Sequence, residues 1–125
     1  MAYLLDTNIV IWWLEKSPAL PGQIYKLLRD SGTRAVVSAV VAWEIAIKSS
    51  LGKLKVPGNL ESVLTTQDFE LLQISFKHAE TVRHLPPLHR DPFDRMLVAQ
   101  AIVEKLTLVT SDPRLADYGS FVKVV

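Results

Sequence analysis

The segment Met1-Ala-Tyr-Leu-Leu-Asp-Thr-Asn8 decides how the rest of the chain is interpreted. It predicts a short buried strand that ends in a carboxylate, because Asp6 is the first charged side chain and Glu15 is the next. A strand that is apolar on both faces belongs in the middle of a covered parallel sheet. The ligand crevice of such a sheet lies beyond the carboxyl ends of the central strands, where Asp6 would sit. A lone carboxylate in apolar surroundings costs several kcal/mol unless another group compensates it.

The remaining chain alternates between short apolar runs and helical patterns. Strands are predicted over residues 35–37, 69–74, 107–110 and 121–125. Helices are predicted over residues 9–14, from after 22 to about 30, 39–50, 59–67, 75–85 and 91–105, with a helical turn from 111–113. Thr7 or Asn8 is expected to cap the first helix, and residues 52–58 form a basic loop carrying Lys53 and Lys55. This order predicts an α/β fold with a mostly parallel sheet of about four to five strands.

Composition bounds the class of protein. The 125 residues are 49% hydrophobic and 22% charged, which predicts one globular domain over residues 1–125. No apolar run is long enough for a bilayer and no basic segment precedes the first apolar stretch, so we expect a cytoplasmic protein without membrane contact. The absence of cysteine excludes disulfides and thiolate metal sites. With a net charge of +1, attraction to a polyanion requires a local basic patch.

Four carboxylates stand where charge is unexpected, namely Asp6, Glu44, Asp94 and Asp112. Glu44 is the only charged residue between Arg34 and Lys48, and its helical neighbours at i−4 and i+3 are apolar. Asp94 falls in the first turn of the helix that Asp91-Pro92 opens, and Asp112 follows the strand over residues 107–110. Asp6, Asp94 and Asp112 therefore follow a strand or lie at the start of a helix, whereas Glu44 lies one to two turns into its helix.

Each of these residues also has a purely structural interpretation, which the sequence leaves open. Asp6, Asp91 and Asp112 are good helix N-caps, and Asp94 stands at the capping-box position relative to Asp91. Glu44 could be a paired or snorkelling core residue.

Taken together, the four positions favour a metal site. Residues that follow strands of one parallel sheet converge on the same edge, where close carboxylates repel and raise one another's pKa. A divalent cation removes that penalty, and all-oxygen ligation suits Mg²⁺ or Mn²⁺. On the sequence we count no histidine or cysteine as near these four residues, which argues against zinc. Metal-assisted phosphodiester hydrolysis is the reaction that such a pocket best supports.

The motifs resemble the signature of PIN-domain nucleases, and in detail that of VapC-type toxins of prokaryotic toxin–antitoxin pairs. They are Leu5-Asp6-Thr7-Asn8, Ser38-x5-Glu44, Asp91-Pro-Phe-Asp94-Arg-x-Leu-x-Ala99 and Thr110-Ser111-Asp112. They occur in order over essentially the whole chain.

The resemblance implies a PIN-like three-layer sandwich and an endoribonuclease that uses Mg²⁺ or Mn²⁺. Asp6, Glu44, Asp94 and Asp112 would hold the metal, with Thr7, Asn8, Ser38, Asp91, Thr110 and Ser111 around them. It also implies a homodimer and an antitoxin partner that lays a helix and a basic tail over the toxin. The apolar helices carrying Trp12, Trp13 and Ile24 are candidates for that groove.

Basic residues and histidines give weaker indications of function. Candidate phosphate contacts are Lys48, Lys53, Lys55, Arg90, Arg95 and Arg114, against the alternative of an ordinary solvated face. His78, His84 and His89 share one segment at no helical ligand spacing and were expected at the surface or in loops. The rival functions are a non-catalytic PIN-like binding module and a receiver-type domain; the latter would need paired acidic residues after the first strand and a lysine after a late one.

Overall fold

Five parallel strands form the centre of the molecule. A computed structural model describes residues 1–56 and 58–125. The strands are β1 (Ala2–Leu5), β2 (Arg34–Ser38), β3 (Glu70–Leu72), β4 (Thr107–Thr110) and β5 (Val122–Val124). They lie in the order β3-β2-β1-β4-β5, and each neighbouring pair is parallel. The fold is therefore the α/β sandwich with a parallel sheet that the sequence predicts, and its strands all end at one edge.

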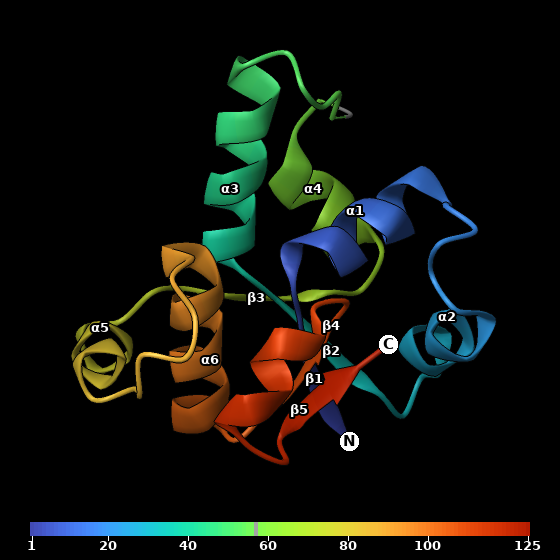
Figure 1. Cartoon of the computed structure of the whole chain (residues 1–125). Coiled ribbons are helices and arrows are strands. Elements are labelled where there is room, and N and C mark those ends of the chain that lie inside the picture. Colours follow the sequence, from blue (N-terminus) through green and yellow to red (C-terminus); the bar gives the residue numbers. More distant parts are fainter. Residues whose placement is uncertain (57) are drawn as a thin grey trace.

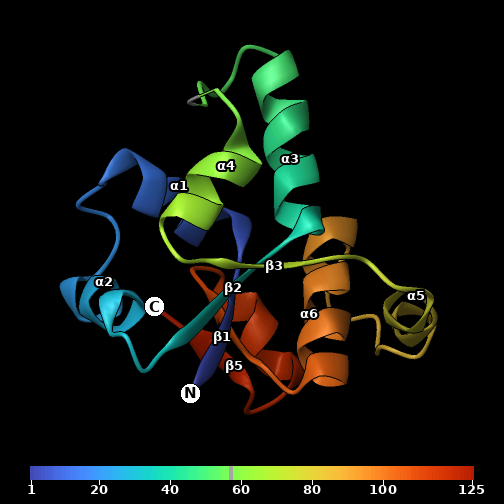
Figure 2. The same cartoon turned by 180° about the vertical axis from the view of Figure 1, so that it is seen from behind.

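Helices cover both faces of this sheet. They are α1 (Thr7–Glu15), α2 (Gly22–Arg29), α3 (Ala39–Ser50), α4 (Leu60–Thr66), α5 (Phe76–Arg83), α6 (Pro92–Glu104) and the 3₁₀ helix η1 (Pro113–Tyr118). Figures 1 and 2 show α1, α2 and α4 on one side of the sheet and α5 and α6 on the other. Helix α3 rises from the end of β2 and contacts both α1 and α6. The result is a three-layer sandwich.

The central strands are buried on both faces, as the first segment predicts. Leu4 and Leu5 of β1 and Leu108 and Val109 of β4 have no exposed surface. A strand enclosed in this way has little freedom of register, because a slip of one residue would exchange the two sides of its side-chain set. The direction and depth of β1 therefore determine where Asp6 emerges.

Polar residues begin the helices that follow the strands. Asp6 accepts a hydrogen bond from the Ile9 backbone N–H and caps α1, and Ser38 accepts one from Val40 N–H and caps α3. Asn59, Ser75, Asp91 and Asp112 cap the later helices in the same way. Each cap satisfies a backbone donor that the helix itself cannot pair.

The structure agrees with most predicted elements and corrects some details. The cap of α1 is Asp6, not Thr7 or Asn8, because its carboxylate is the group that reaches the N–H of the third residue on. Strands β3 and β5 are shorter than the apolar runs that predicted them. The loop predicted over residues 52–58 is non-helical at each of its described positions, and residue 57 lies outside the described residues. In the described part of the chain, no helix is long and apolar enough to cross a bilayer.

The burial of β1 gives a test of the fold. Leu5→Ala should lower the free energy of unfolding by about 3 kcal/mol, because it opens a cavity in a fully packed core. Leu51→Ala is the matched control, since the Leu51 side chain is 63% exposed and its truncation should change stability by less than about 0.5 kcal/mol. Urea unfolding followed by circular dichroism measures both. Equal losses in the two variants would contradict this placement of β1.

Candidate metal centre

Four acidic side chains gather at the carboxyl edge of the sheet. Asp6 directly follows β1 and Asp112 lies two residues beyond β4, while Glu44 and Asp94 come from α3 and α6. The strand order β2-β1-β4 makes the ends of these strands neighbours, so helices that start there converge. Asp6 interacts electrostatically with Glu44 and Asp94, and a histidine links Asp94 with Asp112. The convergence expected from the sequence is therefore present as a connected group.

Asp6 is the most buried member, at 5% exposed surface. Its Oδ1 accepts from Ile9 N–H at 3.0 Å, and its Oδ2 accepts from the Thr110 hydroxyl and from Ser111 N–H at 3.3 Å. Burial raises the pKa of the Asp6 carboxyl, the hydrogen bonds oppose that rise, and the nearby Glu44 adds to it. Hydrogen-bond donors from Ile9, Thr110 and Ser111 therefore compensate the buried carboxylate of Asp6 only incompletely.

Glu44 is held by two neighbours on opposite sides of its carboxylate. Its Oε1 accepts from the Thr7 hydroxyl at 2.6 Å, and its Oε2 pairs with Lys48 Nζ at 3.2 Å, one helical turn further along α3. The side chain is 16% exposed. Glu44 is thus a paired residue, as its structural interpretation requires, but the pairing keeps it beside Asp6 and does not turn it away to solvent.

Asp94 carries the most perturbed carboxyl of the group. Burial raises its pKa to about 6, with a smaller upward effect from the charges of Asp91 and Asp6 and a lowering effect from His89. The capping of α6 falls to Asp91 alone, which accepts from Phe93 N–H at 2.8 Å and Asp94 N–H at 3.3 Å. Asp94 Oδ2 instead lies 2.8 Å from His89 Nε2, so its side chain points into the acidic group.

Asp112 differs from Asp94 because a cation already neutralises it. The Arg114 guanidinium bonds both of its carboxylate oxygens, at 2.9 to 3.2 Å, and lowers the pKa of this carboxyl below its usual value. Asp112 also caps η1 by accepting from Arg114 N–H at 2.9 Å. Its Oδ2 nevertheless lies 3.5 Å from His89 Nε2, so one side of the carboxylate still faces the group.

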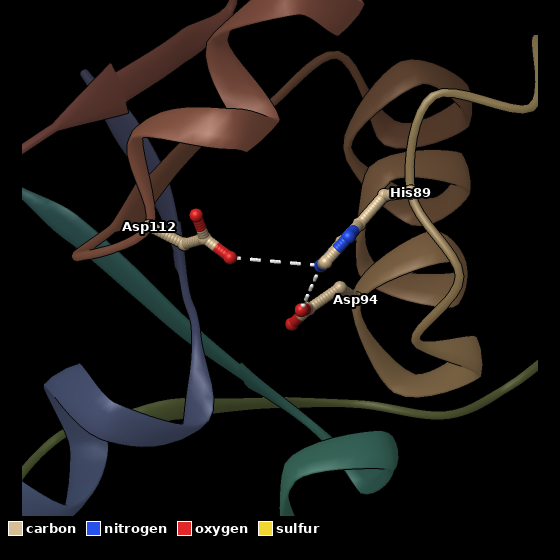
Figure 3. A group of neighbouring side chains, drawn as sticks. All are labelled: His89, Asp94 and Asp112. Carbon is tan, nitrogen blue, oxygen red and sulfur yellow. Dashed lines mark hydrogen bonds and ion pairs between the residues drawn. The ribbon is translucent and has the colours of Figure 1, made fainter.

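His89 corrects the sequence interpretation. The case against zinc, which rests on the lack of a histidine near the four carboxylates in sequence, loses its basis, because His89 Nε2 lies 2.8 Å from Asp94 Oδ2. The ring lies between Asp94 and Asp112, as Figure 3 shows, and one ligand atom from each of the three residues lies within 4.8 Å of the others. The spacing among the three histidines does not reveal that His89 lies beside the carboxylates. The available signal was a histidine five residues before a candidate carboxylate, on a loop that Pro86 and Pro87 bend.

His78 is the second correction, because it is buried and not at the surface. Its Nδ1 accepts from Ser75 N–H at 3.0 Å and completes a capping box for α5, while its Nε2 lies 2.8 Å from Glu104 Oε2. This histidine fastens α5 to α6 and is remote in sequence from the acidic group. His84 is exposed, as expected.

Some of the polar residues predicted around the carboxylates bond a carboxylate directly, and others act through a neighbouring residue or helix. Thr7 and Thr110 bond Glu44 and Asp6 directly, and Ser111 reaches Asp6 through its backbone N–H. Asn8 bonds the Ser111 hydroxyl at 3.3 Å. Ser38 bonds Val40 N–H at 3.0 Å as the cap of α3 and orients that helix.

The candidate phosphate contacts fall into three groups, namely those paired with a carboxylate of the acidic group, one bonded to backbone carbonyls, and those that are exposed. Lys48 and Arg114 pair with Glu44 and Asp112, so they belong to the acidic group itself. Arg95 donates to the carbonyls of Pro86 and Val82 and to the Tyr118 hydroxyl, at 3.1 to 3.2 Å, which ties the 86–91 loop to α5 and η1. Lys53 and Arg90 are exposed. Lys55 is exposed too, on the same loop as Lys53.

The raised pKa of Asp94 predicts how metal-free stability depends on pH. A carboxyl whose folded pKa exceeds its unfolded value stabilises the fold below about pH 4, and that stabilisation is lost as pH rises through about 6. In EDTA, Asp94→Asn should therefore gain stability relative to wild type as pH rises from 4 to 7. The gain is about 1 kcal/mol, reduced from the full conversion because the carboxyl is partly solvated.

Urea unfolding across that pH range measures the difference, with Asp117→Asn as the control at an exposed aspartate of η1. The control should track wild type at every pH. A constant offset between Asp94→Asn and wild type would contradict the raised pKa.

Comparisons with known proteins agree with this architecture. The family model described as PIN domain matches residues 3–120. No curated protein matches the chain. Among solved structures, the chain is similar to VapBC2 from Rickettsia felis bound to a promoter DNA fragment, with 19% identity, TM-score 0.69 and coverage of 100% of this chain and 98% of that one.

Two further structures resemble it at a comparable level. DNA-bound VapBC from Salmonella typhimurium gives 20% identity and a TM-score of 0.69, covering 100% of this chain and 97% of that one. VapBC-1 from nontypeable Haemophilus influenzae gives 19% identity and a TM-score of 0.61, covering 99% and 98%. Identities this low establish a shared fold. Together with the family model over residues 3–120, they show that the chain belongs to the PIN domain family.

Proposed function

We propose that the chain is a metal-dependent endoribonuclease that hydrolyses phosphodiester bonds of single-stranded or structured RNA and acts as the toxin of a toxin–antitoxin pair. The observation that carries the proposal is the convergence of Asp6, Glu44, Asp94 and Asp112 at the carboxyl edge of a PIN-domain sheet. Structural neighbours that are VapBC complexes support the toxin assignment. The whole span 1–125 is taken as one cytoplasmic nuclease domain.

The residues fit a divalent cation. Carboxylate oxygens are the donors that Mg²⁺ and Mn²⁺ prefer, and four carboxylates are brought together here. The pKa of Asp6 and of Asp94 is raised, which marks incompletely compensated negative charge that a cation would relieve. Lys48 and His89 each contact one oxygen of Glu44 and Asp94, whereas Arg114 bonds both oxygens of Asp112. The four carboxylates are therefore the proposed ligands and catalytic residues, with Mg²⁺ or Mn²⁺ as cofactor.

A cation bound there would supply positive charge that eases ionisation of an attacking water and stabilises the leaving oxygen. The chain's own part is to hold the carboxylates in fixed directions. The Thr7 and Thr110 hydroxyls fix one oxygen each of Glu44 and Asp6, and Asn8 braces Ser111. Ser38 and Asp91 act one step further out by starting the helices that carry Glu44 and Asp94.

The substrate would be drawn by the basic residues that the sequence predicts as phosphate contacts. Lys53 and Arg90 are the candidates whose side chains are exposed for a phosphate, while Lys48 and Arg114 can exchange a carboxylate for a phosphate once a cation is bound. Arg95 remains in the proposed set as the residue that shapes the loop before α6. These contacts are sequence-independent and do not select the RNA target.

The proposed antitoxin would lie against α1 and α2. Ile24 and Leu28 point into the core, but Trp12, Leu20 and Tyr25 line a hollow of about 320 Å³ between the two helices. An amphipathic helix buries its apolar face in such a groove. For the proposed homodimer, the exposed Trp43, Ile74 and Phe76 offer an apolar surface on the other side of the sheet.

The decisive experiment is cleavage of a mixed-sequence fluorogenic RNA by purified protein with Mn²⁺, with Mg²⁺ and with EDTA. Cleavage should require the metal and should fall at least about 100-fold in Asp94→Asn, which runs alongside to exclude a contaminating nuclease. Asp117→Asn should cleave like wild type. Single-stranded DNA of the same sequence tests the choice of RNA. Absence of both cleavage and metal binding would favour the non-catalytic binding module.

Metal should also stabilise the fold. Millimolar Mn²⁺ or Mg²⁺ should raise the melting temperature of wild type, since a ligand that binds only the folded state stabilises it by mass action. Asp6→Asn should melt higher than wild type in EDTA, because a buried charge among like charges is gone, and it should lose most of the metal-induced shift. Differential scanning fluorimetry measures both. Equal metal-induced shifts in the two proteins would remove Asp6 from the ligand set.

A further inference from the structure

His89 lies close to two of the proposed ligands at once. Its Nε2 lies 2.8 Å from Asp94 Oδ2 and 3.5 Å from Asp112 Oδ2, carboxylates that reach the site from different elements. The side chain is 7% exposed, so the ring is already fixed by its packing. In Figure 3 the ring edge points to the space between the two carboxylates.

A hydrogen bond from His89 accounts for its contact with only one of the two carboxylates. One imidazole nitrogen presents one hydrogen or one lone pair in the plane of the ring, so it serves one carboxylate well and a second one poorly. The unequal distances to Asp94 and Asp112 reflect that limit. A cation placed between His89, Asp94 and Asp112 can instead accept a lone pair from each of the three residues.

The spacing suits shared coordination. Adjacent ligands of an octahedral ion with bonds of about 2.1 Å are roughly 3 Å apart. The ligand atoms of His89, Asp94 and Asp112 lie at 2.8 Å, at 3.5 Å and within 4.8 Å of one another. Neutral imidazole Nε2 is a common metal ligand in proteins.

We infer that His89 Nε2 is a direct ligand of the cation, which makes the centre a mixed nitrogen–oxygen site selective for first-row transition ions such as Mn²⁺ over Mg²⁺. Imidazole binds Mg²⁺ weakly, whereas its affinity rises along the first transition series. The inference rests on the metal site of the proposed function and adds to it a ligand and a metal preference. Arg114 bonds both oxygens of Asp112, so Asp112 Oδ2 would be shared between the guanidinium and the ion.

The alternative role for His89 is to orient Asp94 without touching the metal. Loss of such a residue also weakens metal binding, by about 10- to 100-fold, so affinity alone does not separate the two roles. The ratio of Mn²⁺ to Mg²⁺ affinity does, and so does direct detection of the nitrogen.

The test therefore combines two readouts on the intact protein. Pulsed EPR of the Mn²⁺-loaded protein should show coupling to an imidazole ¹⁴N, which changes to ¹⁵N coupling when histidine alone is ¹⁵N-labelled. Isothermal calorimetry with Mn²⁺ and with Mg²⁺ should show that His89→Asn lowers the Mn²⁺-to-Mg²⁺ affinity ratio at least fivefold. His84→Asn, at an exposed histidine of the same segment, should retain both the coupling and the ratio.

The outcomes distinguish the two proposals. Mn²⁺ binding without histidine nitrogen coupling in wild type, together with an unchanged affinity ratio in His89→Asn, would overturn the ligand role and leave the nuclease proposal standing. No Mn²⁺ or Mg²⁺ binding to wild type at millimolar concentration would overturn both. The labelled wild-type measurement requires no variant, so it decides the question even if His89→Asn does not fold.

Discussion

The buried carboxylate of Asp6 is the constraint on which the architecture depends. Its Oδ2 is bonded by Thr110 and by the backbone of Ser111, which lie more than a hundred residues further along the chain. Those donors are in place only because β4 pairs with β1 in parallel, with Leu5 opposite Val109. Without that pairing Oδ2 would lose its donors, and only the Ile9 N–H would remain to compensate a buried carboxylate whose uncompensated burial costs several kcal/mol. The position of β4 and the candidate site are therefore consequences of one another.

Helix capping and membership of the acidic group are not alternatives in this fold. Asp6 uses Oδ1 for the first turn of α1 and Oδ2 for β4, and Asp112 caps η1 with Oδ1 while Oδ2 faces His89. The positive end of α1 also favours the carboxylate that caps it. A helix start at the edge of a parallel sheet thus partly stabilises a negative charge that neighbouring charges disfavour. This arrangement explains why local sequence rules and the clustering of charge pointed to the same residues.

The sequence was sufficient where the information is local. Short apolar runs located the strands, and Ser38 and Asp91 marked the helix starts, because a cap bonds a backbone N–H only two or three residues further along. It was insufficient where the chain folds back on itself. His89 lies on the 86–91 loop and reaches the acidic group, and Arg95 on α6 donates to backbone carbonyls; both placements depend on packing between α5, α6 and η1. The pairing of Lys48 with Glu44 follows helical i, i+4 spacing and can be predicted from the sequence, although Lys48 is treated there only as a phosphate contact.

The parallel sheet also determines when the acidic group can first exist. Its members span residues 6 to 112, and β1 lies in the middle of the strand order although it is made first. During synthesis, β1 and α1 must wait for β4 before Asp6 gains its partners. A nascent chain or a proteolytic fragment that stops before residue 107 holds Asp6, Glu44 and Asp94 but lacks both Asp112 and the strand that orients Asp6. Assembly of the acidic group therefore requires the chain at least as far as residue 112, and a shorter product lacks the complete group.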